Sequence, residues 1–353
     1  MSHRPIGRAT VAALAASTLL TACTPLLSVD QRALVVAVAI DRGPCPGVRM
    51  TAQWYASSPS LSVAGGIRPE TESACAATTA EAAQALRART HRHLDLAVAG
   101  LVLVGRSLAR HGLGGVLDSL WREGDLPETV QIATVDGTAA TLLQGSAEGE
   151  QGFLLTTRLV DSFASNTGSV PIVLWRFVQR LGRWPGDAWT PLLAPSPGTV
   201  TDVGVAVYRG ARLAGVLAGD QATAFAWLAK GEGAPDLRVP PAGGTRAMTL
   251  RITSHRVRRR CSGSMPALDL DLRARVREGA AVRVRERDIG PLETAAARAA
   301  YAQTAATLRA LIGVASDPLD LGALACGGDQ ASAPTRAVAL TVHVAIRPDE
   351  RRA

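Results

Sequence analysis

The chain has 353 residues, of which 47% are hydrophobic and 19% are charged, so it carries enough apolar material for a folded core and is not a disordered chain. Its formal net charge is +8, but Lys230 is its only lysine and aromatic residues make up only 4%; we therefore expect no nucleic-acid binding. The longest apolar run beyond the N-terminus, residues 94–105, is too short for a spanning helix, which excludes a polytopic membrane protein.

Residues 1–22 have the pattern of a lipoprotein signal peptide. Arg4 and Arg8 precede a short apolar stretch, and the sequence Leu-Thr-Ala-Cys at 20–23 fits a lipobox. We expect Cys23 to be alkylated by diacylglycerol and to become the first residue of the mature chain, held on a bilayer by its acyl chains. A plain secretory signal and an ordinary first helix are the alternatives.

Four further cysteines follow the lipobox, at Cys45, Cys75, Cys261 and Cys326, and none forms a Cys-x-x-Cys motif. An even number of cysteines outside the cytoplasm favours disulfides. We predict the pairs 45–75 and 261–326; four buried, unreactive thiols are the alternative.

Residues 23–195 are predicted to form an N-terminal α/β domain, because apolar β-branched runs alternate with helical patterns. Ser-, Pro- and Gly-rich residues 58–73 predict a loop, and Pro- and Trp-rich residues 184–202 predict an inter-domain connection. The strands are expected at 32–41, 48–57, 96–104 and 129–135, and the helices at 79–92, 107–122, 137–143 and 170–183.

A second pattern begins after residue 202. Residues 203–240 predict a small middle subdomain made of a tight hairpin and a helix at 221–229. Residues 245–350 predict a C-terminal α/β domain, in which strands alternate apolar and polar side chains around one long helix. Its strands are expected at 245–258, 267–277 and 338–346, and its helix at 291–312.

The sequence contains no recognisable reaction centre. It has no His-Glu-x-x-His, no Gly-x-Ser-x-Gly and no phosphate loop, so we expect no catalytic residue, no cofactor and no metal site. His91 and His93 lie two apart on a predicted helix and so do not share a face, and His343 lies on the outward face of the last strand. The basic run at 255–260 is interpreted as a solvated strand face, with lipid headgroups or an acidic partner as the alternative.

Three stretches resemble the C-subunit lipoproteins of spore germinant receptors, the Ger(x)C family. ALVVAVAID at 33–41 is similar to the family's LAIVTAIGID strand. Residues 80–143 resemble its following helix, strand and helix, with GRSLARHG at 105–112 matching GEELAREG and LDSLWR at 117–122 matching LDFLLRD. Residues 203–233 are similar to GLAVFKKDKLVGWLNGEETRGLLWLKGKV, and the closing helix and strand fit the family's C-terminal end.

The resemblance implies an α+β fold of three mixed α/β lobes in an elongated arrangement, with mixed and antiparallel sheets packed by helices. It implies a non-enzymatic lipoprotein on the outer face of the spore inner membrane. Its partners would be the A and B membrane subunits of a nutrient germinant receptor and, through Cys23, the lipid bilayer. The alternatives are an extracytoplasmic lipoprotein that captures a solute or serves as an interaction module unrelated to sporulation, and a lipid-anchored cell-wall hydrolase.

Overall fold

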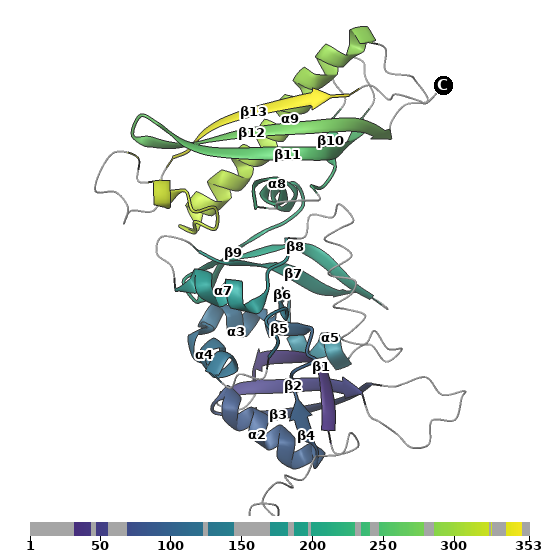
Figure 1. The fold of residues 1–353 in the computed structure, drawn as a ribbon, viewed down its shortest axis with the longest axis vertical. Helices are drawn as coiled ribbons and strands as arrows, with labels where there is room; N and C mark the ends of the chain where they lie inside the picture. The colour runs from purple at the N-terminus through teal and green to yellow at the C-terminus, as the bar shows by residue number, and fades with distance from the viewer. Residues whose placement is uncertain are drawn as a thin grey trace, which may run out of the picture.

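The molecule is elongated, and its two β-sheets follow one another along the long axis (Figure 1). It is a mixed α/β structure whose two sheets are both mixed, which confirms the predicted class of sheets packed by helices. The computed structural model describes residues 32–43, 47–55, 69–122, 126–144, 170–182, 187–196, 199–229, 234–240, 247–278, 286–324, 326 and 337–347.

The first sheet contains nine described strands in the order β3-β2-β1-β5-β6-β7-β8-β9, with β4 also paired to β1. Strands β1, β5, β6 and β7 run parallel, whereas β2, β3, β8 and β9 are added antiparallel at the two ends. The strand bounds are Arg32–Arg42 (β1), Val48–Tyr55 (β2), Pro69–Ala76 (β3), His93–Asp95 (β4), Leu101–Gly105 (β5), Gln131–Val135 (β6), Trp189–Ser196 (β7), Thr199–Arg209 (β8) and Arg212–Leu217 (β9).

Helices cover both faces of this sheet. Buried side chains of α2, α3, α4 and α7 pack on one face, and those of α5 pack on the other. Thr78 caps α2 by accepting a hydrogen bond from the backbone N–H of Glu81, at 3.2 Å. The helix bounds are Thr79–Thr90 (α2), Arg106–His111 (α3), Gly114–Arg122 (α4), Ala139–Gln144 (α5) and Leu174–Leu181 (α7).

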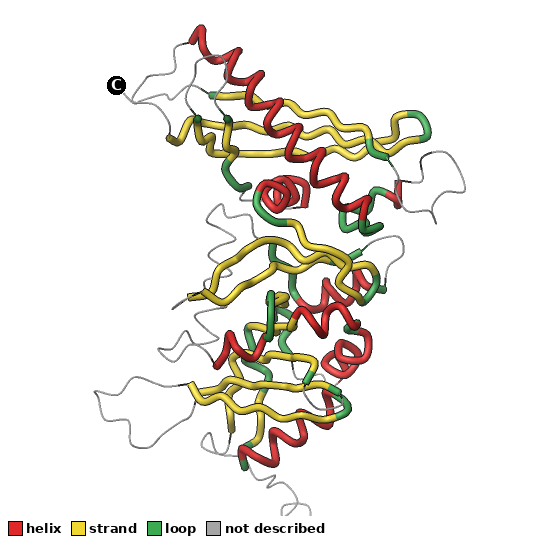
Figure 2. Tube along the Cα trace, turned by 180° about the vertical axis from the view of Figure 1, so that it is seen from behind, coloured by secondary structure: helices red, strands yellow, loops and turns green. Residues whose placement is uncertain are grey.

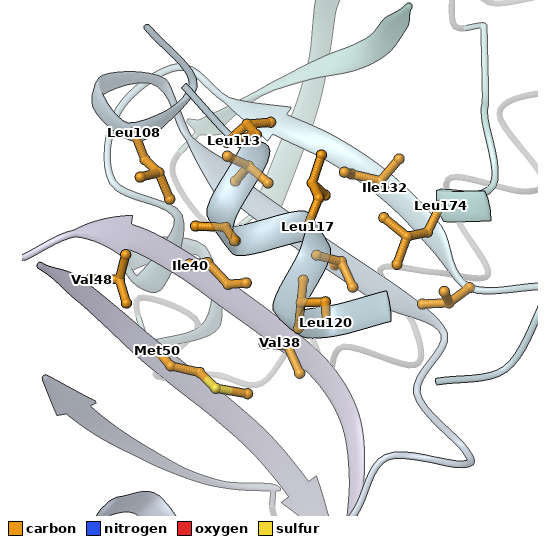
Figure 3. Close-up of a cluster of buried hydrophobic side chains, with 14 of the residues drawn as sticks. Val38, Ile40, Val48, Met50, Leu108, Leu113, Leu117, Leu120, Ile132 and Leu174 are labelled. Atoms are coloured by element: carbon orange, nitrogen blue, oxygen red, sulfur yellow. The ribbon is translucent and has the colours of Figure 1, made fainter. Parts of the chain in front are cut away.

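The apolar runs of the central strands follow from this double cover. In β1, Val38 and Ile40 face the cluster under α4, together with Leu113 and Ile132 (Figure 3), whereas Ala39 faces the cluster under α5. Because neighbouring residues of a strand point to opposite faces, a strand covered on both sides must be apolar at every position. Residues 33–40 satisfy this condition, and they lie within the β-branched run 32–41 that predicted a strand.

The second sheet has four described strands in the order β10-β11-β12-β13, of which β12 and β13 are parallel. The long helix α9 makes the crossover between these two strands and, with α8, covers one face of the sheet (Figure 2). The bounds are Asp220–Ala229 (α8), Leu237–Val239 (β10), Met248–Ser262 (β11), Met265–Glu278 (β12), Glu286–Gly313 (α9), Gly322–Leu324 (the 3-10 helix η2) and Ala339–Ile346 (β13).

The pairing distributes residues 203–240 over both sheets. The β8–β9 hairpin is the end of the first sheet, β10 is the edge of the second, and α8 lies between them (Figure 1). The division into units at 23–195, 203–240 and 245–350 stays a prediction.

Two predicted elements are interrupted. The strand expected at 96–104 begins only at Leu101, as β5, because the Asp95 carboxylate at the end of β4 accepts a hydrogen bond from the backbone N–H of Ala97 at 3.0 Å and starts a turn. The helix expected at 107–122 is two helices, α3 and α4, because Gly112 takes a φ of 127°, a conformation that glycine adopts readily.

Two segments expected to be irregular contain strands. Strand β3 occupies the end of the loop expected at 58–73, and β7 lies inside the connection expected at 184–202. β7 pairs with β6 only through Leu192 and Leu193, so the prolines on either side of these residues take no part in that pairing. The Pro- and Trp-rich composition of this segment predicted a connection, whereas the segment contains a strand of the sheet.

Candidate functional site

The carboxyl ends of the parallel strands are the usual place for a ligand in an α/β sheet. Here Asp41 lies near the end of β1, Gly105 ends β5, and Asp136 follows β6. These three residues lie together at one edge of the first sheet, next to the start of α5. This edge is therefore the first candidate for a binding site.

Asp41 fills this position with its own carboxylate. Its two oxygens accept hydrogen bonds from the backbone N–H groups of Ala139 and Ala140, at 2.7 and 2.8 Å. A Cβ added at Gly105 would collide with the same carboxylate, so the strand fits only because that residue is a glycine. The chain itself satisfies the start of α5, and Asp41 is a structural cap rather than a free acid.

Burial raises the pKa of the Asp41 carboxyl, and the two backbone hydrogen bonds and the charge of Arg49 oppose that rise. Nearby, Arg106 forms an ion pair with Asp136. Sequence patterns cannot show the partners of Asp41, because these lie 98 and 99 residues further along the chain.

A second polar cluster joins the first sheet to the segment that follows α9. Arg180, on α7, donates from Nε to the backbone oxygen of Asp187 at 2.9 Å and from Nη2 to that of Pro318 at 2.8 Å. Its two Nη atoms also bind the carboxylate of Asp320 at 2.8 and 3.1 Å. The guanidinium lies 4.7 Å from the centroid of the Trp189 ring. One side chain thus holds three separate pieces of chain together.

Two carboxylates complete this junction. Asp187 accepts hydrogen bonds from the backbone N–H groups of Gly210 and Asp317, at 3.1 and 2.8 Å. Asp317 accepts from those of Leu321 and Gly322, at 2.9 and 2.7 Å. Burial raises the pKa of Asp317, the backbone hydrogen bonds lower it, and the charges of Asp320 and Asp187 raise it further. The carboxylate oxygens are engaged by backbone donors, so this cluster serves as a structural junction.

A buried group of hydroxyls lies beneath the junction. The Thr134 hydroxyl is 2.7 Å from that of Thr190 and 2.6 Å from that of Tyr208. Burial raises the pKa of Tyr208 to about 12, against the opposing effect of its hydrogen bonds with Thr134 and Thr190. The phenol therefore stays neutral near pH 7, and its ring packs edge-on against Phe177. This network orders the core.

The predicted disulfide residues are partly described. Cys261, at the end of β11, is joined to Cys326 by a disulfide with 5.5 Å between the Cα atoms, which is the pair predicted from the sequence. Cys75, in β3, is also disulfide-bonded. Cys45, its expected partner, and the proposed lipidation site Cys23 lie outside the described residues.

The histidines do not converge. His91 ends α2 in the left-handed conformation, with a φ of 50°, and His93 begins β4, so the two do not lie on one helix as predicted. His343 is exposed on β13, as expected. Within the part of the chain that the structure describes, no group of three or more His, Cys, Asp or Glu side chains is arranged to hold a metal ion.

The basic run at 255–260 lies in β11, and Arg256, Arg258 and Arg260 are exposed there. Arg258 and Arg260 form ion pairs with Asp271 and Asp269 of β12. The run is the solvated strand face expected from its alternation. Among the described helices, none is both long enough and apolar enough to cross a bilayer.

The chain is similar to known proteins in sequence over one segment and in fold over most of its length. Residues 27–195 match the family described as "Spore germination protein N-terminal domain". The crystal structure of the GerBC protein is similar in fold, with a TM-score of 0.53 and 13% sequence identity, over 88% of this chain and 96% of that one. No curated protein sequence matches.

Proposed function

We propose that this chain, whose residues 27–195 match the spore germination protein N-terminal domain family, is the lipid-anchored C-subunit of a nutrient germinant receptor. In this role it scaffolds the A and B membrane subunits from the outer face of the spore inner membrane. The family match over residues 27–195 is the observation that carries the proposal. The similarity in fold to GerBC extends beyond that domain, over most of the chain.

The geometry is consistent with a scaffold. The buried carboxylate of Asp41 and the half-buried carboxylate of Asp317 accept hydrogen bonds from backbone N–H groups, and the buried phenol of Tyr208 binds a threonine hydroxyl. A catalytic acid, base or nucleophile must instead present its reactive atom to a substrate. These groups build a rigid body, and a rigid body suits the positioning of other subunits.

The anchor is tested with Cys23→Ala in the host. We expect an unprocessed precursor, loss of the chain from the spore inner membrane, and nutrient germination as slow as that of a deletion strain, because no thiol remains to be acylated. Thr24→Ala is the matched control, since it changes the neighbouring residue and leaves the thiol in place. Membrane retention of the Cys23→Ala chain would contradict the anchor.

The scaffolding role is tested separately by deletion of the gene. We expect the A and B subunits to fall in abundance in the inner membrane and to lose nutrient-triggered germination, and they should co-purify with the chain in mild detergent from the parent strain. Normal germination of the deletion strain with every nutrient tried would overturn the receptor role.

A further inference from the structure

The second sheet has one covered face and one open face. Leu268, Leu270 and Leu272 of β12 are buried against α8 and α9. Further along the strand, the outward positions carry the exposed side chains of Arg273, Arg275 and Arg277. In both views α9 lies on one side of the strands, and no described helix lies on the other (Figures 1 and 2). The open face consists of the outward side chains of β10, β11, β12 and β13.

The two ends of the open face differ in charge compensation. Near the β11–β12 turn, Arg260 binds Asp269 through two hydrogen bonds of 2.7 and 3.0 Å, and Arg258 lies 3.6 Å from Asp271. At the other end Arg277 forms an ion pair with Asp236, but four further exposed arginines have no described carboxylate within ion-pair distance. We name these the arginine patch: Arg238, Arg251, Arg273 and Arg275.

The arginine patch opposes a rule of sheet stability. Arg251 lies directly opposite Arg275 on the neighbouring strand, and like charges in that position destabilise a sheet. Arg273 lies on the same face as Arg275, about 7 Å away along the strand, since alternate residues share a face. At the other end of the same strands, arginines of β11 instead pair with aspartates of β12. A local pattern that works against folding is typical of a functional surface.

We propose that the arginine patch is a docking surface for an acidic surface of a partner protein. A guanidinium binds a carboxylate through two parallel hydrogen bonds, and neighbouring arginines on flat strands present several such forks in fixed positions. The charge that the sheet leaves uncompensated would be neutralised by the carboxylates of the partner.

Two observations favour a protein over an anionic bilayer. The outward residues beside the patch, Thr249, Ser254 and Ala345, are short and carry no ring or long aliphatic chain to insert among lipids. The patch also lies at the opposite end of the molecule from the start of β1 at Arg32 (Figure 1). Cys23 is nine residues before Arg32, a reach of about 30 Å. This second argument rests on the proposed anchoring through Cys23.

The test measures binding of fluorescent poly-L-glutamate to the full lipidated chain in phosphatidylcholine nanodiscs. We expect the triple variant Arg251→Gln, Arg273→Gln, Arg275→Gln to bind about tenfold more weakly, because three exposed ion pairs are lost. The matched control is Arg110→Gln, Arg209→Gln, Arg309→Gln, which removes the same charge from exposed positions on other elements and should bind like the parent. An equal loss in the control would mean a response to net charge alone and would overturn the proposal.

Two further readouts decide the class of partner and exclude misfolding. In phosphatidylglycerol nanodiscs the parent should still bind poly-L-glutamate about tenfold more tightly than the triple variant. Equal affinities of the two in these nanodiscs would mean that anionic lipid occupies the patch, and would contradict the proposal. The patch variant should melt no lower than the parent, because the repulsion between Arg251 and Arg275 is gone. If the triple variant does not fold, Arg251→Gln alone should still weaken binding, and full binding by it would count against the patch. No spore or receptor enters this assay, so its failure leaves the proposed function standing.

Discussion

The two sheets of this protein differ in how many of their faces are covered by helices. The central strands β1, β5 and β6 of the first sheet are buried on both faces, between α2, α3, α4 and α7 on one side and α5 on the other. In the second sheet, β11, β12 and β13 are buried only on the side of α8 and α9, and their other side is rich in arginine. The described central strands of the first sheet therefore have no open face, whereas those of the second sheet do.

This difference separates stability from recognition along one chain. A sheet covered twice loses more apolar surface to folding and has little freedom in its side chains. A sheet covered once can vary its outward residues with little effect on folding, so these residues can be selected for binding. The predictions below test this division, from the largest expected effect to the smallest.

The largest contrast is expected between Leu103 and Arg273. Leu103 lies on β5 and is fully buried in the cluster under α5, so Leu103→Ala should lower the free energy of unfolding by about 3 kcal/mol through lost burial and a residual cavity. Arg273→Ala, on the open face, should change it by no more than about 0.5 kcal/mol. Urea unfolding of both variants measures the two values. Similar losses in the two would break the contrast between the sheets.

The junction between the sheets is probed by Arg180→Met. The change removes four hydrogen bonds that join α7 to Asp187, Pro318 and Asp320, and should cost about 2 kcal/mol. Calorimetry should show the two halves unfolding less cooperatively, and Trp189 should change its fluorescence because the stacked guanidinium is gone.

The control for this variant is Arg176→Met, on the same helix. Arg176 also lies over a tryptophan ring, that of Trp175, at 5.2 Å, but it is exposed and joins no other segment. We expect Arg176→Met to leave both the unfolding transition and the cooperativity unchanged. An equal effect of the two variants would mean that the junction does not couple the sheets.

The smallest effect is a pH dependence at the junction. Burial raises the pKa of Asp317 above its usual value, so its stabilising contribution is complete below about pH 4 and declines as the pH rises through the raised pKa. Asp317→Asn does not titrate but leaves one backbone N–H without its acceptor, at a cost of about 1 kcal/mol. The stability gap between parent and variant should therefore narrow as the pH rises.

This gap is measured by urea unfolding from pH 4 to pH 7. Asp220→Asn is the control, since Asp220 is the exposed first residue of α8 and the change removes an exposed carboxylate instead of a half-buried one. Its gap from the parent should stay constant over the same range. A gap at Asp317 that widens with pH would contradict the direction assigned to its pKa.

The hydrophobic pattern alone predicted the strands and helices in which burial of a side chain depends only on which face of the element is covered. Strand β1 was expected to begin at Arg32 and does, and the alternation that predicted β13 reflects one covered face. The interruptions at Asp95 and Gly112 were missed because they depend on a side chain turning back on the backbone and on one positive φ. Apolar content does not report either feature.

The polar clusters could not be predicted from local sequence patterns. Arg180 meets its partners Pro318 and Asp320 across 138 and 140 residues, and Asp41 meets α5 across about a hundred. Contacts of that separation arise only when the sheet order brings the segments together. The absence of catalytic and metal-binding motifs in the sequence gave no sign of where the chain places its buried charges.

The carboxylate of Asp41 has a consequence for how the first half of the molecule responds to its surroundings. In many α/β proteins an exchangeable anion occupies the start of a helix, and its occupancy rises and falls with the concentration of solute. Here the anion is covalently part of β1 and cannot leave. Changes in small-molecule concentration therefore cannot load or empty this position.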